Sequence, residues 1–233
     1  MAHKFTRRDF LRLGAVGAAA LLLRDLTLPG GTVDPSLVNT FFRVPFTPAA
    51  PGASVTDAST LSDQCNLSLI DLPKWPAIIP RRAEPDPVTG LHMTGKPVSI
   101  DLTSYRLKVY GKVHHPLSLS INDLRCMPKV TTEVDIICKG YFEDWSIWAG
   151  VPIHEVLDRA GVQPGAVSIN MNAGDGYSNQ ASVEEARASN AFLAYEWVKG
   201  QPLPILFGFP LRAVFPSQEG YYDVKWLLEM EVV

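Results

Sequence analysis

The residue best suited to chemistry is Cys138, in the stretch VDIICKGYFEDWSIW at Val134–Trp148. Apolar residues lead up to this thiol and Gly140 follows it, so we expect the sulfur to lie where a buried strand opens into a loop. A soft thiolate in that position suits a metal or cofactor ligand. The other interpretation is a small buried hydrophobic residue. A thiol-redox role is weaker, because no second cysteine stands at C-x-x-C spacing.

A second pair of metal-ligand residue types is His114 and His115. Adjacent residues on an extended segment point in opposite directions, so the two rings do not converge on one ion. Pro116 follows them, and a turn is therefore favoured over a metal site.

The elements that must position Cys138 show mixed periodicities. Alternation predicts a strand at Tyr105–Tyr110 that ends at Gly111. Helical spacing predicts an amphipathic helix from Pro152, closed by Gly161. Such an irregular alternation indicates one α+β domain with a mixed sheet. Short helices are predicted after Ser120 and Ser182, and further strands at Leu117 and Leu119, Thr131–Cys138, Ala166–Met171, Phe192–Trp197 and Val224–Val233.

The composition is that of an ordinary globular protein, with 46% hydrophobic and 19% charged residues. The formal net charge is −3, and no arginine-rich patch with interleaved aromatic residues occurs. Such a charge provides no general attraction to phosphate backbones, so we expect no nucleic-acid partner.

Residues 1–25 resemble a twin-arginine export signal. The paired Arg7 and Arg8 precede a weakly hydrophobic run at Leu13–Leu23, which is shorter than the about 20 residues that span a bilayer. The resemblance implies a periplasmic or otherwise exported protein that folds around a cofactor before it crosses the membrane. A basic start to a cytosolic helix is the alternative. No A-x-A cleavage site directly follows, so removal of the signal and its retention as an N-terminal membrane anchor both stay open.

Residues 26–97 form the next predicted unit. Eleven of the 19 prolines fall in this stretch, without a sustained period. We predict an extended proline-rich segment that wraps a folded body, because apolar residues such as Phe46, Ile70 and Trp75 need a surface to dock on. A free, solvated tail is the alternative. The compact domain is predicted at residues 98–233.

Several short motifs occur in the order of one known family. From about Tyr105 to the C-terminus the chain resembles the molybdopterin-binding domain of the sulfite oxidase family. The resemblance implies a mixed α+β domain built around one molybdenum-molybdopterin cofactor. The motifs are Cys138–Gly140, Trp148–Pro152, Asp175–Tyr177, Leu193–Glu196, Gly200–Pro204, Gly208–Arg212 and, after Gly220, Val224–Leu227.

The resemblance also implies roles for single residues. Cys138 matches the cysteine whose thiolate binds molybdenum beside two dithiolene sulfurs. Tyr177 matches a tyrosine whose hydroxyl hydrogen-bonds a substrate oxygen; a turn tyrosine packed on the core is the equal alternative. Arg212 and Lys225 match basic residues that contact the cofactor, where a surface salt bridge is the alternative for each. The other implied cofactor-binding residues are Phe42 and Arg43, and Asp223 and Val224 through backbone groups.

Two positions depart from the family pattern. Phe207 stands where the family usually has a His or Asn that contacts the cofactor, and Lys139 follows Cys138. With Glu143 and Asp144 nearby, the pocket charge need not match that of a sulfite-binding site. These departures motivate an alternative, a degenerate or cofactor-free binding domain that keeps the fold without the redox chemistry.

Three cysteines leave at least one thiol unpaired. Cys65 and Cys126 are candidates for a bridge between the proline-rich segment and the domain, with Cys138 as the odd thiol. Sequence does not show proximity, so this pairing stays open.

Together these features predict an exported molybdenum-cofactor-dependent oxidoreductase. It would transfer an oxygen atom to or from a small-molecule substrate, by sulfite-type oxidation or sulfoxide-type reduction. We expect no heme domain in this chain. Electrons would therefore be exchanged with a separate carrier, such as a c-type cytochrome or a membrane redox subunit.

Overall fold

The computed structural model describes residues 67, 70–198, 200–216 and 218–233, which belong to the compact unit Ala53–Val233. The predicted export signal, the predicted cofactor contacts Phe42 and Arg43, and Cys65 lie outside the described residues. Cys126 is disulfide-bonded, and Cys138 is a free thiol.

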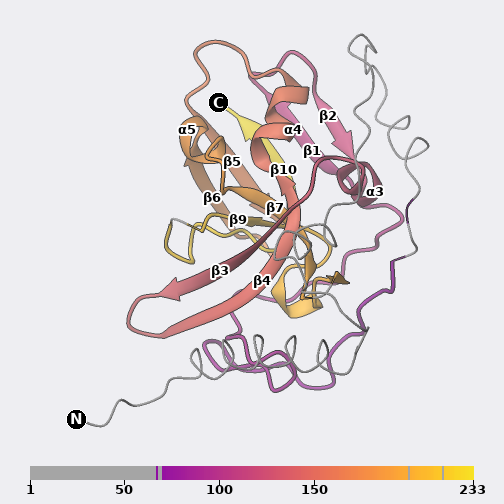
Figure 1. The fold of residues 1–233 in the computed structure, drawn as a ribbon, viewed down its shortest axis with the longest axis vertical. Helices are drawn as coiled ribbons and strands as arrows, with labels where there is room; N and C mark the ends of the chain where they lie inside the picture. Colours follow the sequence, from indigo (N-terminus) through magenta and orange to yellow (C-terminus); the bar gives the residue numbers. More distant parts are fainter. Residues whose placement is uncertain (1–66, 68–69, 199, 217) are drawn as a thin grey trace, which may run out of the picture. The chain divides into compact units, whose positions relative to one another are not determined.

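Short strands dominate the described part of the chain, with few helices between them (Figure 1). This architecture confirms the predicted mixed α+β class. The elements are β1 (Leu107–Gly111), β2 (Leu117–Leu119), α3 (Ile121–Arg125), β3 (Val130–Cys138), β4 (Phe142–Pro152), α4 (Ile153–Ala160), β5 (Ser168–Ala173), β6 (Ser178–Ser182), α5 (Val183–Ala186), β7 (Phe192–Trp197), β8 (Gln201–Pro202), the 3₁₀ helix η2 (Ile205–Phe207), β9 (Arg212–Val214) and β10 (Leu227–Val232).

The strands form two sheets. The first has the order β2-β1-β10-β5-β6 and is mixed, because β1 and β10 run parallel and the other pairs antiparallel. The second has the order β3-β4-β7-β8, with β9 also paired to β7, and all its pairs are antiparallel. β3 and β4 form a long hairpin in Figure 1.

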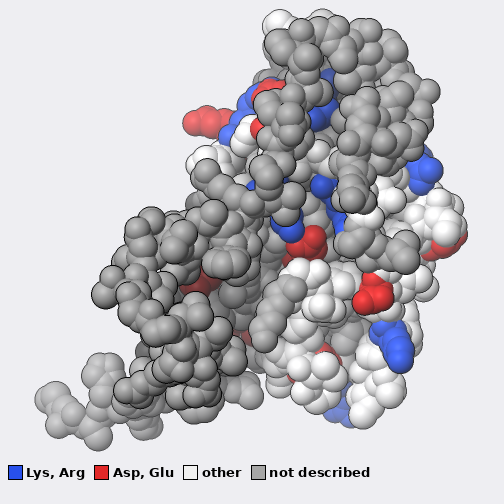
Figure 2. Space-filling model, turned by 45° about the vertical axis from the view of Figure 1, so that its right-hand side comes forward, with Lys and Arg blue, Asp and Glu red and all other residues white. Residues whose placement is uncertain are grey.

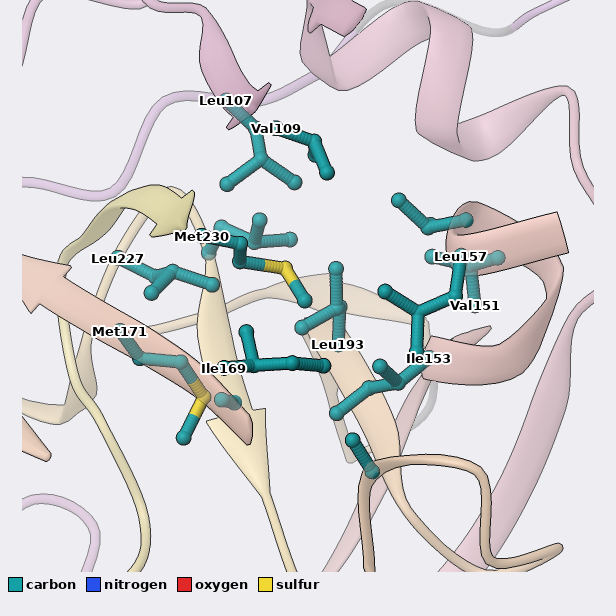
Figure 3. Close-up of a cluster of buried hydrophobic side chains, with 14 of the residues drawn as sticks. Leu107, Val109, Val151, Ile153, Leu157, Ile169, Met171, Leu193, Leu227 and Met230 are labelled. Carbon is teal, nitrogen blue, oxygen red and sulfur yellow. The ribbon is translucent and has the colours of Figure 1, made fainter. Parts of the chain in front are cut away.

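Apolar side chains from both sheets and α4 meet in the main core (Figure 3). Ile153, Val156, Leu157 and Ala160 are the buried face of α4, at the helical spacing that the sequence predicted. Gly161 ends α4 in the left-handed conformation, with φ of 65°. Local sequence thus sets the helix, and packing against the strands stabilises it.

Both predicted helix caps are present. The Ser120 hydroxyl accepts a hydrogen bond from the Asp123 backbone N–H, and the Asp123 carboxylate accepts one in return from the Ser120 N–H. Ser182 and Glu185 form the same reciprocal pair at α5. These capping boxes start helices too short to be stable alone.

Cys138 ends β3 as predicted, but the loop that follows it is only a short turn at residues 139–141. The chain turns tightly and returns as β4, whose Phe142 pairs with Cys138 across the hairpin. β4 was missed because its inward-facing Asp144 and Ser146 are polar whereas Trp145 and Ile147 on the other face are apolar, the reverse of the pattern expected of a half-buried strand.

Packing begins before the predicted boundary at residue 98. Leu91 and Met93 are buried in a second apolar cluster, together with Trp148, Phe207 and Trp226. Of the predicted docking residues, Ile70 packs against the main core, whereas the Trp75 side chain is 46% exposed.

On the face in Figure 2, basic and acidic side chains lie interspersed outside the grey atoms. Within the described residues, none of the helices has the length and apolar character needed to cross a membrane.

Candidate functional site

Cys138 ends β3, half-buried, at the tip of the β3–β4 hairpin. The Tyr141 N–H donates to the Cys138 carbonyl at 3.0 Å and closes the turn. In the described part of the chain, no three His, Cys, Asp or Glu side chains converge as a metal-binding group. A metal bound to Cys138 would therefore take its other ligands from outside this set, as a pterin with two dithiolene sulfurs would provide.

The inward face of the hairpin continues from Cys138 and Phe142 along β4. Asp144, Ser146 and Trp148 follow at alternate positions and are buried. Because residues i and i+2 of a strand share a face, this row connects the thiol to the interior of the protein.

Arg212 on β9 lies at the far end of that row. Its guanidinium carbon is 4.9 Å from the centre of the Trp148 ring, and its Nη2 donates to Asp223 Oδ2 at 2.6 Å, with both side chains 5% exposed. The second Asp223 oxygen accepts from the Phe215 N–H at 2.9 Å. Arg212 is therefore part of a buried pair and not of a surface salt bridge.

Two buried donors beside this pair have no acceptor within the described residues, namely Arg212 Nε and Trp148 Nε1. An unmade hydrogen bond of this kind costs about 1–3 kcal/mol when no partner is supplied. Two such donors next to each other indicate a place where a polar ligand binds.

Lys225 is the second buried cation. Its ammonium donates to the carbonyls of Thr94 and Leu206, the latter at 3.2 Å, and lies 5.6 Å from the Phe207 ring and 5.0 Å from the Trp226 ring. Within the described residues it forms no ion pair with a carboxylate. It is thus solvated by carbonyls and aromatic faces, and not by a surface partner.

The electrostatic environment makes the Lys225 charge costly. Burial, and then the nearby positive charge of Arg212, hold its pKa well below its ordinary value, and Asp175, Asp223 and Asp144 oppose the shift. An anionic group bound beside Lys225 would favour the protonated form.

Gly208 lets the two cations come together. It adopts φ of 111°, and a side chain there would meet Arg212 Cβ and the Lys225 Cα and Cβ at 3.2 Å. The residue before it, Phe207, faces the Lys225 ammonium with its ring. At the position where the resemblance implies a polar side chain, this protein therefore presents an aromatic face.

Tyr177 follows the turn between β5 and β6. Its hydroxyl donates to the Tyr221 carbonyl at 2.6 Å, and the Asn179 amide donates to the same oxygen at 3.0 Å. Partial burial, together with the carboxylates of Asp223 and Asp175, raises its pKa. The hydroxyl predicted to contact substrate thus stays protonated at neutral pH, and its proton points to the backbone.

The loop before β10 connects this tyrosine to the Cys138 strand. The Gly220 N–H donates to the Ile137 carbonyl at 2.9 Å. Lys139 forms an exposed ion pair with Glu219 on the same loop. The Lys139 charge is therefore balanced at the surface.

Of the predicted backbone contacts, Val224 uses both groups within the protein. Its N–H donates to Ala213 at 3.1 Å, and its carbonyl accepts from Ala213 at 2.9 Å. Asp223 acts through its carboxylate, which holds Arg212. Asp223 thus positions the Arg212 side chain, and Val224 joins its segment to the Ala213 backbone, next to Arg212.

His92 was missed by the sequence reasoning. Its ring stacks on Phe142, and its Nδ1 lies 2.6 Å from Asp144 Oδ1, across a separation of 52 residues. A single histidine in a proline-rich stretch carries no periodic signal, so only the fold reveals it.

These residues fit the expected cofactor. A free thiol, two buried cations and two donors without acceptors match a group that combines a thiolate-binding metal with an anionic phosphate.

Comparison with known proteins agrees with this chemistry. Residues 93–233 match the family model described as the oxidoreductase molybdopterin binding domain. The chain is 34% identical over 138 residues to the uncharacterized oxidoreductase YuiH of Bacillus subtilis, covering 59% of this chain and 69% of that protein.

Two relatives have named activities. The mitochondrial sulfite oxidase of Macaca fascicularis is 31% identical, with 66% of this chain and 36% of that protein covered. The protein-methionine-sulfoxide reductase catalytic subunit MsrP of Xanthomonas campestris is 28% identical, with 58% and 47% covered. The chain thus spans less than half the length of either relative.

A solved structure, the sulfane dehydrogenase SoxCD of Paracoccus pantotrophus, has a similar fold, with a TM-score of 0.57 and 20% identity over 87% of this chain and 59% of that chain. The chain therefore belongs to the molybdopterin-binding oxidoreductase domain family that includes the sulfite oxidases.

Proposed function

We propose that this protein is an exported oxidoreductase that holds a molybdenum-molybdopterin cofactor and transfers an oxygen atom to or from a small substrate. The observation that carries the proposal is the row on the hairpin, which runs from the free thiol of Cys138 to the buried Arg212, whose Nε has no acceptor among the described residues. One end offers a metal ligand, and the other offers donors for an anion.

Each residue has a separate task in this proposal. The Cys138 thiolate would hold the metal, and Arg212 and Lys225 would bind the anionic end of the cofactor. Asp223 keeps the guanidinium in place. When bound, the cofactor supplies two-electron oxygen-atom transfer. The protein contributes binding, orientation and a site with little water.

Two reactions are proposed for the substrate, sulfite-type oxidation and sulfoxide-type reduction. The named relatives act in these two ways, as a sulfite oxidase and as a methionine-sulfoxide reductase subunit. In both directions we propose that a separate redox protein, such as a c-type cytochrome or a membrane redox subunit, exchanges the electrons.

The decisive experiment combines metal analysis with an activity screen. The protein and Cys138→Ser are purified from a molybdenum-competent host, and molybdenum and pterin are quantified in both. We expect near-stoichiometric metal in the parent and none in the variant. Sulfite, sulfoxides and N-oxides are then tested in both directions with an artificial electron mediator.

Molybdenum-free parent protein, or equal molybdenum in Cys138→Ser, would contradict the proposal. The first of these results would favour the degenerate binding domain, for which Phe207 at the usual polar position is the specific observation.

Export is tested separately. Replacing Arg7 and Arg8 together by lysine should keep the protein in the cytoplasm of a bacterial host, whereas the parent is found in the periplasmic or membrane fraction. Unchanged fractionation would contradict the proposed export and leave the proposed cofactor and reaction unaffected.

A further inference from the structure

His92 and Asp144 form a buried polar pair that the proposed function leaves unused. The Asp144 carboxylate is 6% exposed and accepts two hydrogen bonds from one residue, from the His92 backbone N–H at 2.6 Å and from the His92 ring at 2.6 Å. Both carboxylate oxygens are thereby directed at a single histidine.

A third contact fixes the plane of the imidazole. The His92 ring lies parallel to the Phe142 ring, with centroids 4.6 Å apart and an interplanar angle of 5°. Phe142 is the cross-strand partner of Cys138, and partners of this kind have Cβ atoms about 4.5–5.5 Å apart. The imidazole therefore stacks directly on Phe142, the residue paired with Cys138 across the hairpin.

The pairing also sets which nitrogen carries the proton. An ionised carboxylate only accepts hydrogen bonds, so Nδ1 must donate to Asp144. Nε2 then carries the lone pair of the neutral ring, or the second proton of the charged ring. Within the described residues no partner lies at Nε2, and the side chain is 25% exposed. A ring so fixed can exchange its Nε2 proton with a ligand or with solvent.

The pair lies between the two ends of the proposed cofactor site. Cys138 and Phe142 are on one side, and the Asp144 charge acts on the buried Lys225 ammonium on the other. The charged group in direct contact with the ring is Asp144 from β4, and the Lys225 ammonium before β10 interacts electrostatically with that carboxylate. The His92 ring therefore lies beside the hairpin that carries the Cys138 thiol and against the carboxylate that acts on Lys225.

We propose that His92 transfers protons at the exchanged oxygen atom and that Asp144 is its positioning residue; this proposal rests on the proposed function. Sulfoxide reduction consumes two protons and two electrons and yields sulfide and water, and sulfite oxidation with water releases two of each. The separate electron carrier exchanges the electrons. His92 Nε2 passes the protons, one at a time, between solvent and that oxygen, and regains its resting state after each transfer.

The test uses the cofactor-loaded full chain with His92→Ala, His92→Gln and Asp144→Asn. Because His154 also lies beside a carboxylate, Glu155 at 3.7 Å, but on α4, His154→Ala is the matched control. Molybdenum content and the thermal unfolding midpoint are measured first, and then kcat and KM across pH. Added imidazole is used to rescue His92→Ala.

We expect both His92 variants to keep their molybdenum and to lose roughly 100-fold or more in kcat, with little change in KM. Imidazole should restore part of the His92→Ala rate, and the limb of the kcat–pH profile that His92 sets should disappear. Asp144→Asn should give a smaller loss and a shifted limb. His154→Ala should resemble the parent in every measurement.

Three results would overturn the proposal: kcat within twofold of the parent in both His92 variants, activity that falls only in proportion to molybdenum, or a parent pH profile retained by His92→Gln. A parent that contains no molybdenum is a different failure, because it removes the proposed function itself.

Discussion

The main apolar core and the charged cluster of Arg212, Asp223 and Lys225 are both buried, but their side chains differ in polarity and in how completely they are partnered. In the core, Ile169 and Leu193 are fully buried among other aliphatic side chains. In the cluster, cations lie beside donors that find no acceptor in the part of the chain that the structure describes. The apolar core needs no further partner. The cluster carries buried polar groups, and an anionic ligand would offset the free-energy cost of burying them.

One strand connects the two regions. The first half of β4 turns Asp144, Ser146 and Trp148 toward the site, and its last residues, such as Val151, enter the main core (Figure 3). The strand is therefore anchored in the core at one end and carries residues of the site at the other. A truncation in the core should therefore lower stability without removing the groups of the site.

The largest effect is expected when the charged cluster loses its carboxylate. Asp223→Asn leaves the Arg212 guanidinium buried without its counterion, so the free energy of unfolding should fall by about 3–5 kcal/mol. Denaturant titration of cofactor-free protein measures this change. A loss below about 1 kcal/mol would show that the pair is less buried in solution than its geometry indicates.

Truncation in the core should cost nearly as much but leave the site intact. Ile169→Ala removes fully buried methyl groups on β5 and should lower the unfolding free energy by about 2–5 kcal/mol. The folded fraction should keep its molybdenum. The control is Val167→Ala, two residues earlier in the chain and 68% exposed, which should change stability by less than about 0.5 kcal/mol.

Replacing a buried side chain usually destabilises a protein, but Lys225→Met should not destabilise the cofactor-free form. The folded-state pKa of Lys225 is depressed, so above that pKa the unfolded chain binds a proton that the folded protein lacks. Stability of cofactor-free protein should therefore rise with pH from this lowered pKa toward the ordinary value of 10.5.

The Lys225→Met variant should be as stable as the parent at neutral pH or more stable, with this rise removed, and it should lose cofactor. The measurement is unfolding free energy against pH, below the ordinary tyrosine pKa of 10.0. Cofactor-loaded parent should show a smaller rise, because an anion beside Lys225 restores its proton. The same slope in parent and variant would contradict this assignment.

The smallest effect is expected at the exposed ion pair near the thiol. Lys139→Ala removes the contact with Glu219, but both side chains are solvated, so the unfolding midpoint should not change. Cofactor content should also be retained. A loss of molybdenum in Lys139→Ala would show that this charge belongs to the site and not to the surface.

Much of the framework was predictable because its signals are local. The spacing on α4, the capping boxes at Ser120 and Ser182 and the alternation in β1 each depend on a few consecutive residues. β6 was missed along with β4. It is a short, polar strand, so its existence depends on pairing with β5 and not on its own pattern.

The candidate site was predictable only in part. Cys138, Arg212 and Lys225 stand out through motif order, but the sequence left open whether the two cations lie at the surface. Their burial, and the carbonyls that surround Lys225, come from segments far apart in the chain. Pairing of His92 with Asp144 has no sequence signature, since it requires two distant segments to meet.

The sequence by itself determined the helices and strands that have a local signal, which family the chain resembles and which thiol that family would use as a metal ligand. Local propensity, periodicity and motif order carry that information without tertiary contacts. Only the tertiary structure decided that Arg212 and Lys225 are buried together, that two donors have no acceptor within the described residues, and that His92 faces the hairpin of Cys138. Such features depend on desolvation and on the meeting of distant segments, which arise when the chain packs.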